Sequence, residues 1–155
     1  EVTWYELELL AAQNNIRGMA RKINEGLTFD QRHEIEKNYY TARIKEASGD
    51  TSQLKELYTW LAWSNPFNEE ATIHAAEFIG ESDAFEEYDI LLNALEVNPR
   101  SVKLLKAYIY SCAENQFDTY AAISLETLQT LVSPSTYREV SAEYLRIADL
   151  AKNDF

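Results

Sequence analysis

The sequence of 155 residues is poor in cysteine, proline and glycine, with one, three and four of them respectively. Cys112 has no second cysteine with which to form a disulfide or share a metal ion, and its apolar neighbours favour a place in the core. The glycines stand singly at positions 18, 26, 49 and 80, so no glycine-rich loop is available to hold a phosphate group.

Basic residues are also scarce, and long apolar runs are absent. The chain has 26 acidic and 14 basic side chains, a formal net charge of −12, which disfavours nucleic acid as a partner. No apolar run approaches the roughly 18–20 residues that cross a bilayer, so we expect no membrane insertion of this segment. The first residue is Glu1 rather than Met, and we expect a piece of a longer protein. The sequence does not determine the cellular compartment.

Residues that carry catalysis or bind metals form no recognisable set. The two histidines, His33 and His74, are far apart in sequence and have no cysteine nearby, which predicts no metal site. Acidic pairs such as Glu69-Glu70 are typical of solvated first turns of helices, where they complement the helix dipole. The sequence therefore predicts a protein that is not an enzyme and uses no cofactor.

A recurring motif is present instead. A proline after a small polar residue ends an apolar helical pattern at Asn65-Pro66, Asn98-Pro99 and Ser133-Pro134, at intervals of 33 and 35 residues. Each interval contains two amphipathic helical patterns separated by a turn. Such a period predicts an all-α array of helical hairpins.

The first two dozen residues differ from the rest. Thr3, with Glu6 three residues later, has the spacing of a capping box, which predicts Thr3 as the N-cap of a helix over 2–25. Asn14-Asn15 interrupts that pattern, and one long helix is favoured over a hairpin of two short ones. Gly26 is the expected C-cap, and Thr28 or Asp30 is the expected cap of the next helix.

The remaining helices follow from the apolar periodicity. One of them is expected to end near Asn65-Pro66. The five that follow are expected to cover 69–79, 85–97, 102–113, 117–132 and 137–151. The division of the chain is then an N-terminal extra helix or hairpin over 1–27 and repeats over 28–66, 67–99, 100–134 and, in part, 135–155. In the helix before Pro66, one of Trp60 and Trp63 is expected in the core and the other at the surface.

The stretch from Ala84-Phe85-Glu86-Glu87-Tyr88 to Ala94-Leu95-Glu96-Val97-Asn98-Pro99 resembles the tetratricopeptide repeat family, best over residues 48–134. The resemblance implies a right-handed α-α superhelix whose first helices line a concave groove. Ala76 matches the small residue that the family favours between paired helices. Ile109, Leu54 and Glu87 depart from the family pattern. Ile73 and Glu77 stand where one arm of the family's terminal-carboxylate clamp would need cationic and amide groups, so that clamp is not expected.

By this resemblance nine residues are candidates for the groove: His74, Glu77, Glu81, Lys103, Lys106, Tyr110, Arg138, Ser141 and Leu145. Lys103 and Lys106 suggest a carboxylate or acidic peptide as ligand, and the alternative is that all nine belong to solvated helix faces. The predicted function is binding of a protein or peptide by a domain of a larger protein. Alternatives are a rigid spacer beside an enzyme or membrane domain, and self-association through the C-terminal end.

Overall fold

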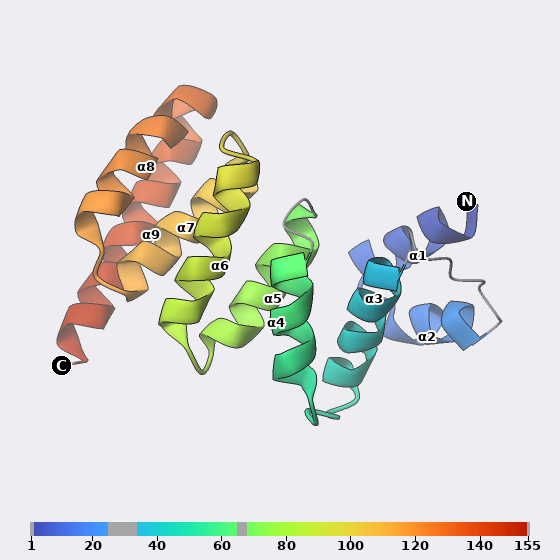
Figure 1. Cartoon of the computed structure of the whole chain (residues 1–155). Coiled ribbons are helices and arrows are strands. Elements are labelled where there is room, and N and C mark those ends of the chain that lie inside the picture. Colours follow the sequence, from blue (N-terminus) through green and yellow to red (C-terminus); the bar gives the residue numbers. More distant parts are fainter. Residues whose placement is uncertain (1, 25–33, 65–67, 155) are drawn as a thin grey trace. The chain divides into compact units, whose positions relative to one another are not determined.

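A computed structural model describes residues 2–24, 34–64 and 68–154 of the chain (Figure 1). Within these ranges every regular element is an α-helix, which confirms the all-α prediction. The chain divides into two compact units, Glu1–Ser64 and Asn65–Phe155, and each is described separately below.

The N-terminal unit begins with a hairpin of two short helices. The prediction of one long helix is wrong, because α1 ends at Ala12 and Asn14 takes a left-handed conformation with φ of 53°. Asn15 then accepts a hydrogen bond from the Gly18 N–H at 2.9 Å, which satisfies a free donor in the first turn of α2. Thr3 lies inside α1 rather than at its N-cap. The helices of this unit are α1 (Val2–Ala12), α2 (Ile16–Asn24), α3 (Glu34–Ala47) and α4 (Leu54–Ser64).

Each helix of this unit packs against the next one in the chain. Arg43 of α3 donates hydrogen bonds to the Ala11 carbonyl at 3.1 Å and to Asn14 Oδ1 at 2.9 Å, so it satisfies groups at the C-terminal end of α1. Trp60 and Trp63 are 45% and 43% exposed, which makes the prediction of one core tryptophan wrong. Leu54, Tyr58, Leu61 and Ala62 of α4 fill the core instead. The predicted caps at Gly26, Thr28 and Asp30 lie outside the described residues.

Over residues 68–154 the C-terminal unit holds five helices whose bounds agree with the predicted ones within a few residues. They are α5 (Glu69–Gly80), α6 (Ala84–Val97), α7 (Val102–Glu114), α8 (Asp118–Leu131) and α9 (Pro134–Asn153). The proline motif begins α9 rather than only ending α8, because Pro134 is the first residue of α9 and Ser133 is its N-cap.

Short polar side chains start four of these five helices. The capping oxygen accepts a backbone N–H at 3.0 to 3.2 Å in each case, and the N-caps are Asn68, Asp83, Ser101 and Ser133. Each cap of this kind stabilises a helix by about 0.5–2 kcal/mol relative to alanine. The exception is α8, whose N-cap position holds Phe117. The backbone N–H of Phe117 donates a hydrogen bond to the Cys112 carbonyl at 2.8 Å and so satisfies the C-terminal end of α7. Gln116, just before it, has the left-handed backbone conformation of such helix ends, with φ of 60°.

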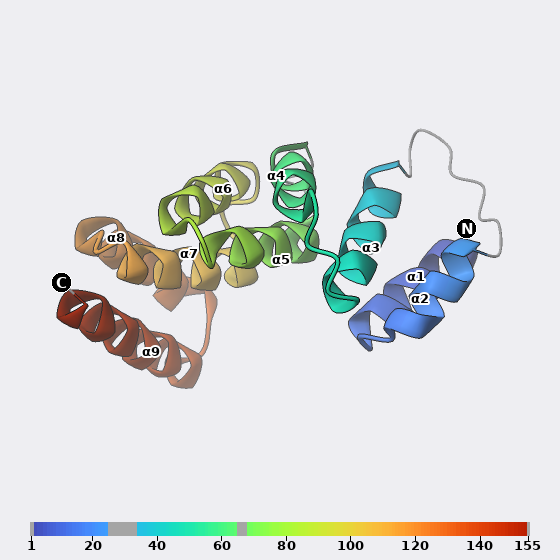
Figure 2. The same ribbon diagram turned by 90° about the horizontal axis from the view of Figure 1, so that it is seen from below.

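The packing in this unit is centred on α7, which contacts α5, α6, α8 and α9 (Figure 2). Leu104, Ile109 and Cys112 of α7 are fully buried, and the place of Cys112 in the core is confirmed. Burial raises the pKa of the Cys112 thiol to about 11, so the thiol stays protonated and acts as an apolar packing group. Ala76 is fully buried as expected.

Candidate functional site

The nine candidate groove residues all lie in the C-terminal unit: three on α7, three on α9, and His74 and Glu77 on α5 with Glu81 as its C-cap. Their spacing within each helix puts them on one face, because residues three or four apart are neighbours on a helix surface. The five charged candidates, Glu77, Glu81, Lys103, Lys106 and Arg138, are exposed, and so is Leu145. His74, Tyr110 and Ser141 are partly buried.

The candidate faces of α5 and α7 meet at an ion pair. Lys103 Nζ lies 3.2 Å from Glu70 Oε1, and Glu70 is on the same face of α5 as His74 and Glu77. The two paired side chains stand 33 residues apart in sequence, which is one repeat period. Because both are well exposed, the pair contributes at most about 1 kcal/mol. The ion pair shows that the candidate faces of α5 and α7 lie side by side.

The candidate face of α7 also approaches α9. Burial raises the pKa of Tyr110, and the carboxylates of Glu143 and Glu139 on α9 raise it further. The phenol of α7 therefore lies close to negative charge from α9. The face around Lys103 and Lys106 is thus mixed in charge, because Lys103 already faces Glu70 and two carboxylates of α9 lie near Tyr110.

A cluster of aromatic rings lies elsewhere in this unit, and the sequence reasoning missed it. Tyr88 of α6 is the central ring, with centroid distances of 4.9 Å to Phe117, 5.3 Å to Tyr108 and 6.0 Å to Phe85. Tyr120 of α8 lies 6.5 Å from Tyr88 and 6.1 Å from Phe117. Phe85 and Tyr120 are 55% and 54% exposed, so the cluster runs from the core to the surface. The signal in the sequence was Phe117, a large aromatic residue at the N-cap position of α8, where a short polar residue is usual.

The distribution of charge along the chain was a second missed signal. Ten of the 26 acidic residues lie within residues 56–99, which contain no lysine or arginine. The other parts of the chain have 16 acidic and 14 basic residues and are close to neutral. The net charge of −12 is therefore almost entirely a property of one stretch, most of which is the hairpin of α5 and α6.

One carboxyl group of this stretch is buried. Glu87 of α6 is 9% exposed and lies against Gly80 of α5, where a Cβ atom would overlap its carboxyl group. Burial, together with the nearby carboxylates of Glu114 and Glu77, raises the pKa of Glu87 to about 8. Burial also raises the pKa of Glu114. Glu87 therefore holds a proton at neutral pH, and the missing side chain at Gly80 leaves room for its carboxyl group.

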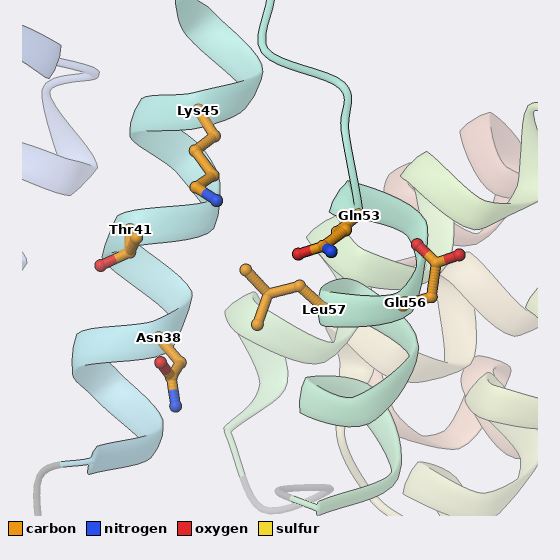
Figure 3. A pocket seen from close by; sticks show the side chains of 6 residues that line it. All are labelled: Asn38, Thr41, Lys45, Gln53, Glu56 and Leu57. Carbon is orange, nitrogen blue, oxygen red and sulfur yellow. The ribbon is translucent and has the colours of Figure 1, made fainter.

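The N-terminal unit has a shallow groove of about 630 Å³ between α3 and α4 (Figure 3). Leu57 and Gln53 extend from the α4 side toward α3. The lining residues are Asn38, Thr41, Lys45, Gln53, Glu56 and Leu57. A mixture of amide, hydroxyl and single opposite charges suits polar contacts but contains no nucleophile paired with a base.

The described residues show neither a metal-binding cluster nor a membrane-spanning helix. In residues 2–24, 34–64 and 68–154 no three side chains among His, Cys, Asp and Glu gather closely enough to hold a metal ion. No helix in the same ranges combines the length and apolar character that a bilayer crossing requires. His33 lies outside the described residues. Models of known protein families, curated proteins and solved structures give no match to this chain.

Proposed function

We propose that this chain is a non-catalytic protein- or peptide-binding module, and that its C-terminal unit is a tetratricopeptide-like array in which helical hairpins stack as a right-handed superhelix. The observation that carries the proposal is the packing of α7. This helix contacts its hairpin mate α8, both helices of the preceding hairpin, and α9 of the next one. A helix with neighbours on several sides is what an internal element of a stacked array requires.

The binding face is the one formed by α5, α7 and α9, with the nine candidate residues on it. The Glu70–Lys103 pair supports the adjacency of α5 and α7, and the proximity of Tyr110 to Glu139 and Glu143 supports that of α7 and α9. Glu77, Lys106 and Arg138 of this face are exposed, so these three side chains are not needed for the core. Rigid helices present such a face without folding on binding, so a ligand loses mainly its own conformational entropy.

A selection from a random peptide library tests this assignment. Peptides enriched on the wild-type chain are measured by fluorescence anisotropy against a double variant of the face, Glu77→Lys with Lys106→Glu. A control double variant, Glu126→Lys with Lys55→Glu, makes the same two charge changes at exposed positions of α8 and α4, outside this face. We expect affinity to fall about tenfold or more in the face variant and to change little in the control, with equal melting temperatures.

Two results would contradict the proposal. Enrichment of no peptide would favour a rigid spacer between other domains, and an equal loss of affinity in both double variants would place binding outside this face.

A further inference from the structure

We propose that the exposed aromatic cluster at the start of α6 and α8 is a second interaction surface, and that it binds an arginine- or lysine-rich segment of a partner protein. The cluster consists of Phe85, Tyr88, Phe117 and Tyr120. It is separate from the face of α5, α7 and α9, so this inference goes beyond the proposed function.

The geometry of the rings suits contact with a cation. Phe117 stands edge-on to both Phe85 and Tyr120, at interplanar angles of 87° and 86°. Tyr88 lies beneath them and is only 7% exposed. Its ring is tilted by 32° to Phe85 and by 34° to Tyr120. The result is a buried ring bordered by partly exposed ones. Aromatic faces attract ammonium and guanidinium groups through the ring quadrupole.

The charge around the rings points to the same ligand. Neither α6 nor α8 contains a lysine or arginine, whereas together they carry five acidic residues besides the buried, protonated Glu87, namely Glu86, Asp89, Glu96, Asp118 and Glu126. Asp89 stands four residues after Phe85, on the same face of α6, and is positioned to pair with a cation that stacks on the Phe85 ring. Asp118 follows Phe117 directly and is held by a hydrogen bond from the Tyr144 hydroxyl at 2.7 Å.

The same charges argue against other occupants of the cluster. A second copy of the chain would bring its own cation-free face of α6 and α8, and like charges would oppose that contact. An acidic peptide, a nucleic acid or an anionic lipid surface would be repelled for the same reason. Large apolar rings that remain exposed on two helices without lysine or arginine are therefore best matched by a partner that supplies the positive charge.

The probe is a fluorescein-labelled peptide in which arginine alternates with glycine, measured by anisotropy on the whole chain at physiological salt. A glutamate–glycine peptide of equal length is the negative control. Three variants are compared with wild type: Phe85→Leu keeps apolar bulk but removes the ring, Asp89→Asn removes one charge beside the ring, and Glu126→Gln removes one charge from α8. Circular dichroism confirms that each variant is folded.

We expect the arginine peptide to bind and the glutamate peptide not to bind. Phe85→Leu and Asp89→Asn should each weaken binding about fivefold, and Glu126→Gln should change it less than twofold. The proposal is overturned if the arginine peptide does not bind. It is also overturned if Phe85→Leu has no effect while the two charge variants lose affinity equally, since that result describes diffuse attraction to an acidic protein. Neither result bears on the face of α5, α7 and α9, because the double variant Glu77→Lys with Lys106→Glu tests that face separately.

Discussion

The buried carboxyl group of Glu87 should make the C-terminal unit less stable as pH rises. Its pKa is about 8 in the folded chain against an ordinary value of 4.5, because burial and the Glu114 carboxylate disfavour the charged form. Between these two values the folded state holds a proton that the unfolded state has released, so the free energy of unfolding falls as pH increases. One proton corresponds to about 1.4 kcal/mol per pH unit.

The expected loss is therefore about 2–3 kcal/mol between roughly pH 5.5 and pH 7.5. Glu87→Gln keeps the shape of the side chain and removes the titration. We expect the variant to match wild type near pH 5 and to be more stable by about 2 kcal/mol near pH 7.5.

Urea unfolding followed by far-ultraviolet circular dichroism measures this difference at a series of pH values. All three tryptophans belong to the unit Glu1–Ser64, so tryptophan fluorescence reports the unit that lacks Glu87 and serves as an internal reference. Glu126→Gln, on the exposed side of α8, is the matched control and should follow the wild-type curve. Parallel pH curves for Glu87→Gln and wild type would refute the reasoning, because they would show that Glu87 takes up no extra proton on folding.

Three further outcomes follow from local geometry. Gln116→Gly should raise the melting temperature by the equivalent of about 1 kcal/mol, since φ of 60° is strained for Gln and free for Gly; a lower melting temperature would contradict this. Gly80→Ala should destabilise the wild type through overlap with the Glu87 carboxyl group but cost less in a Glu87→Ala background, and additive effects in a double-mutant cycle would disprove the contact. Ser101→Ala should lower the free energy of unfolding by about 1 kcal/mol in urea titrations, because the Leu104 N–H loses its capping partner; an unchanged midpoint would show that the cap is dispensable.

Local sequence signals were sufficient for most helices of the C-terminal unit. Proline, a capping residue and an apolar stripe each act within a few residues of the helix end that they define, so they can be read without knowledge of the tertiary structure. The N-terminal hairpin was missed because Ile16, Met19 and Ile23 continue a helical period through the turn. The left-handed backbone at Asn14 depends on the packing of α1 against α2 and on the hydrogen bond from Arg43, which comes from a distant part of the chain.

The sequence by itself determined that the chain is helical, where most helices begin and end, and that its acidic charge is concentrated in one stretch, because these properties depend on neighbouring residues and composition. Only the tertiary structure decided which side chains meet across helices. Glu87 fits a crowded position because Gly80 of another helix leaves room for it, and Phe85, Tyr108 and Tyr120 gather around Tyr88 because three helices bring them together. Such contacts depend on the distances between helices, and a helical period carries no information about them.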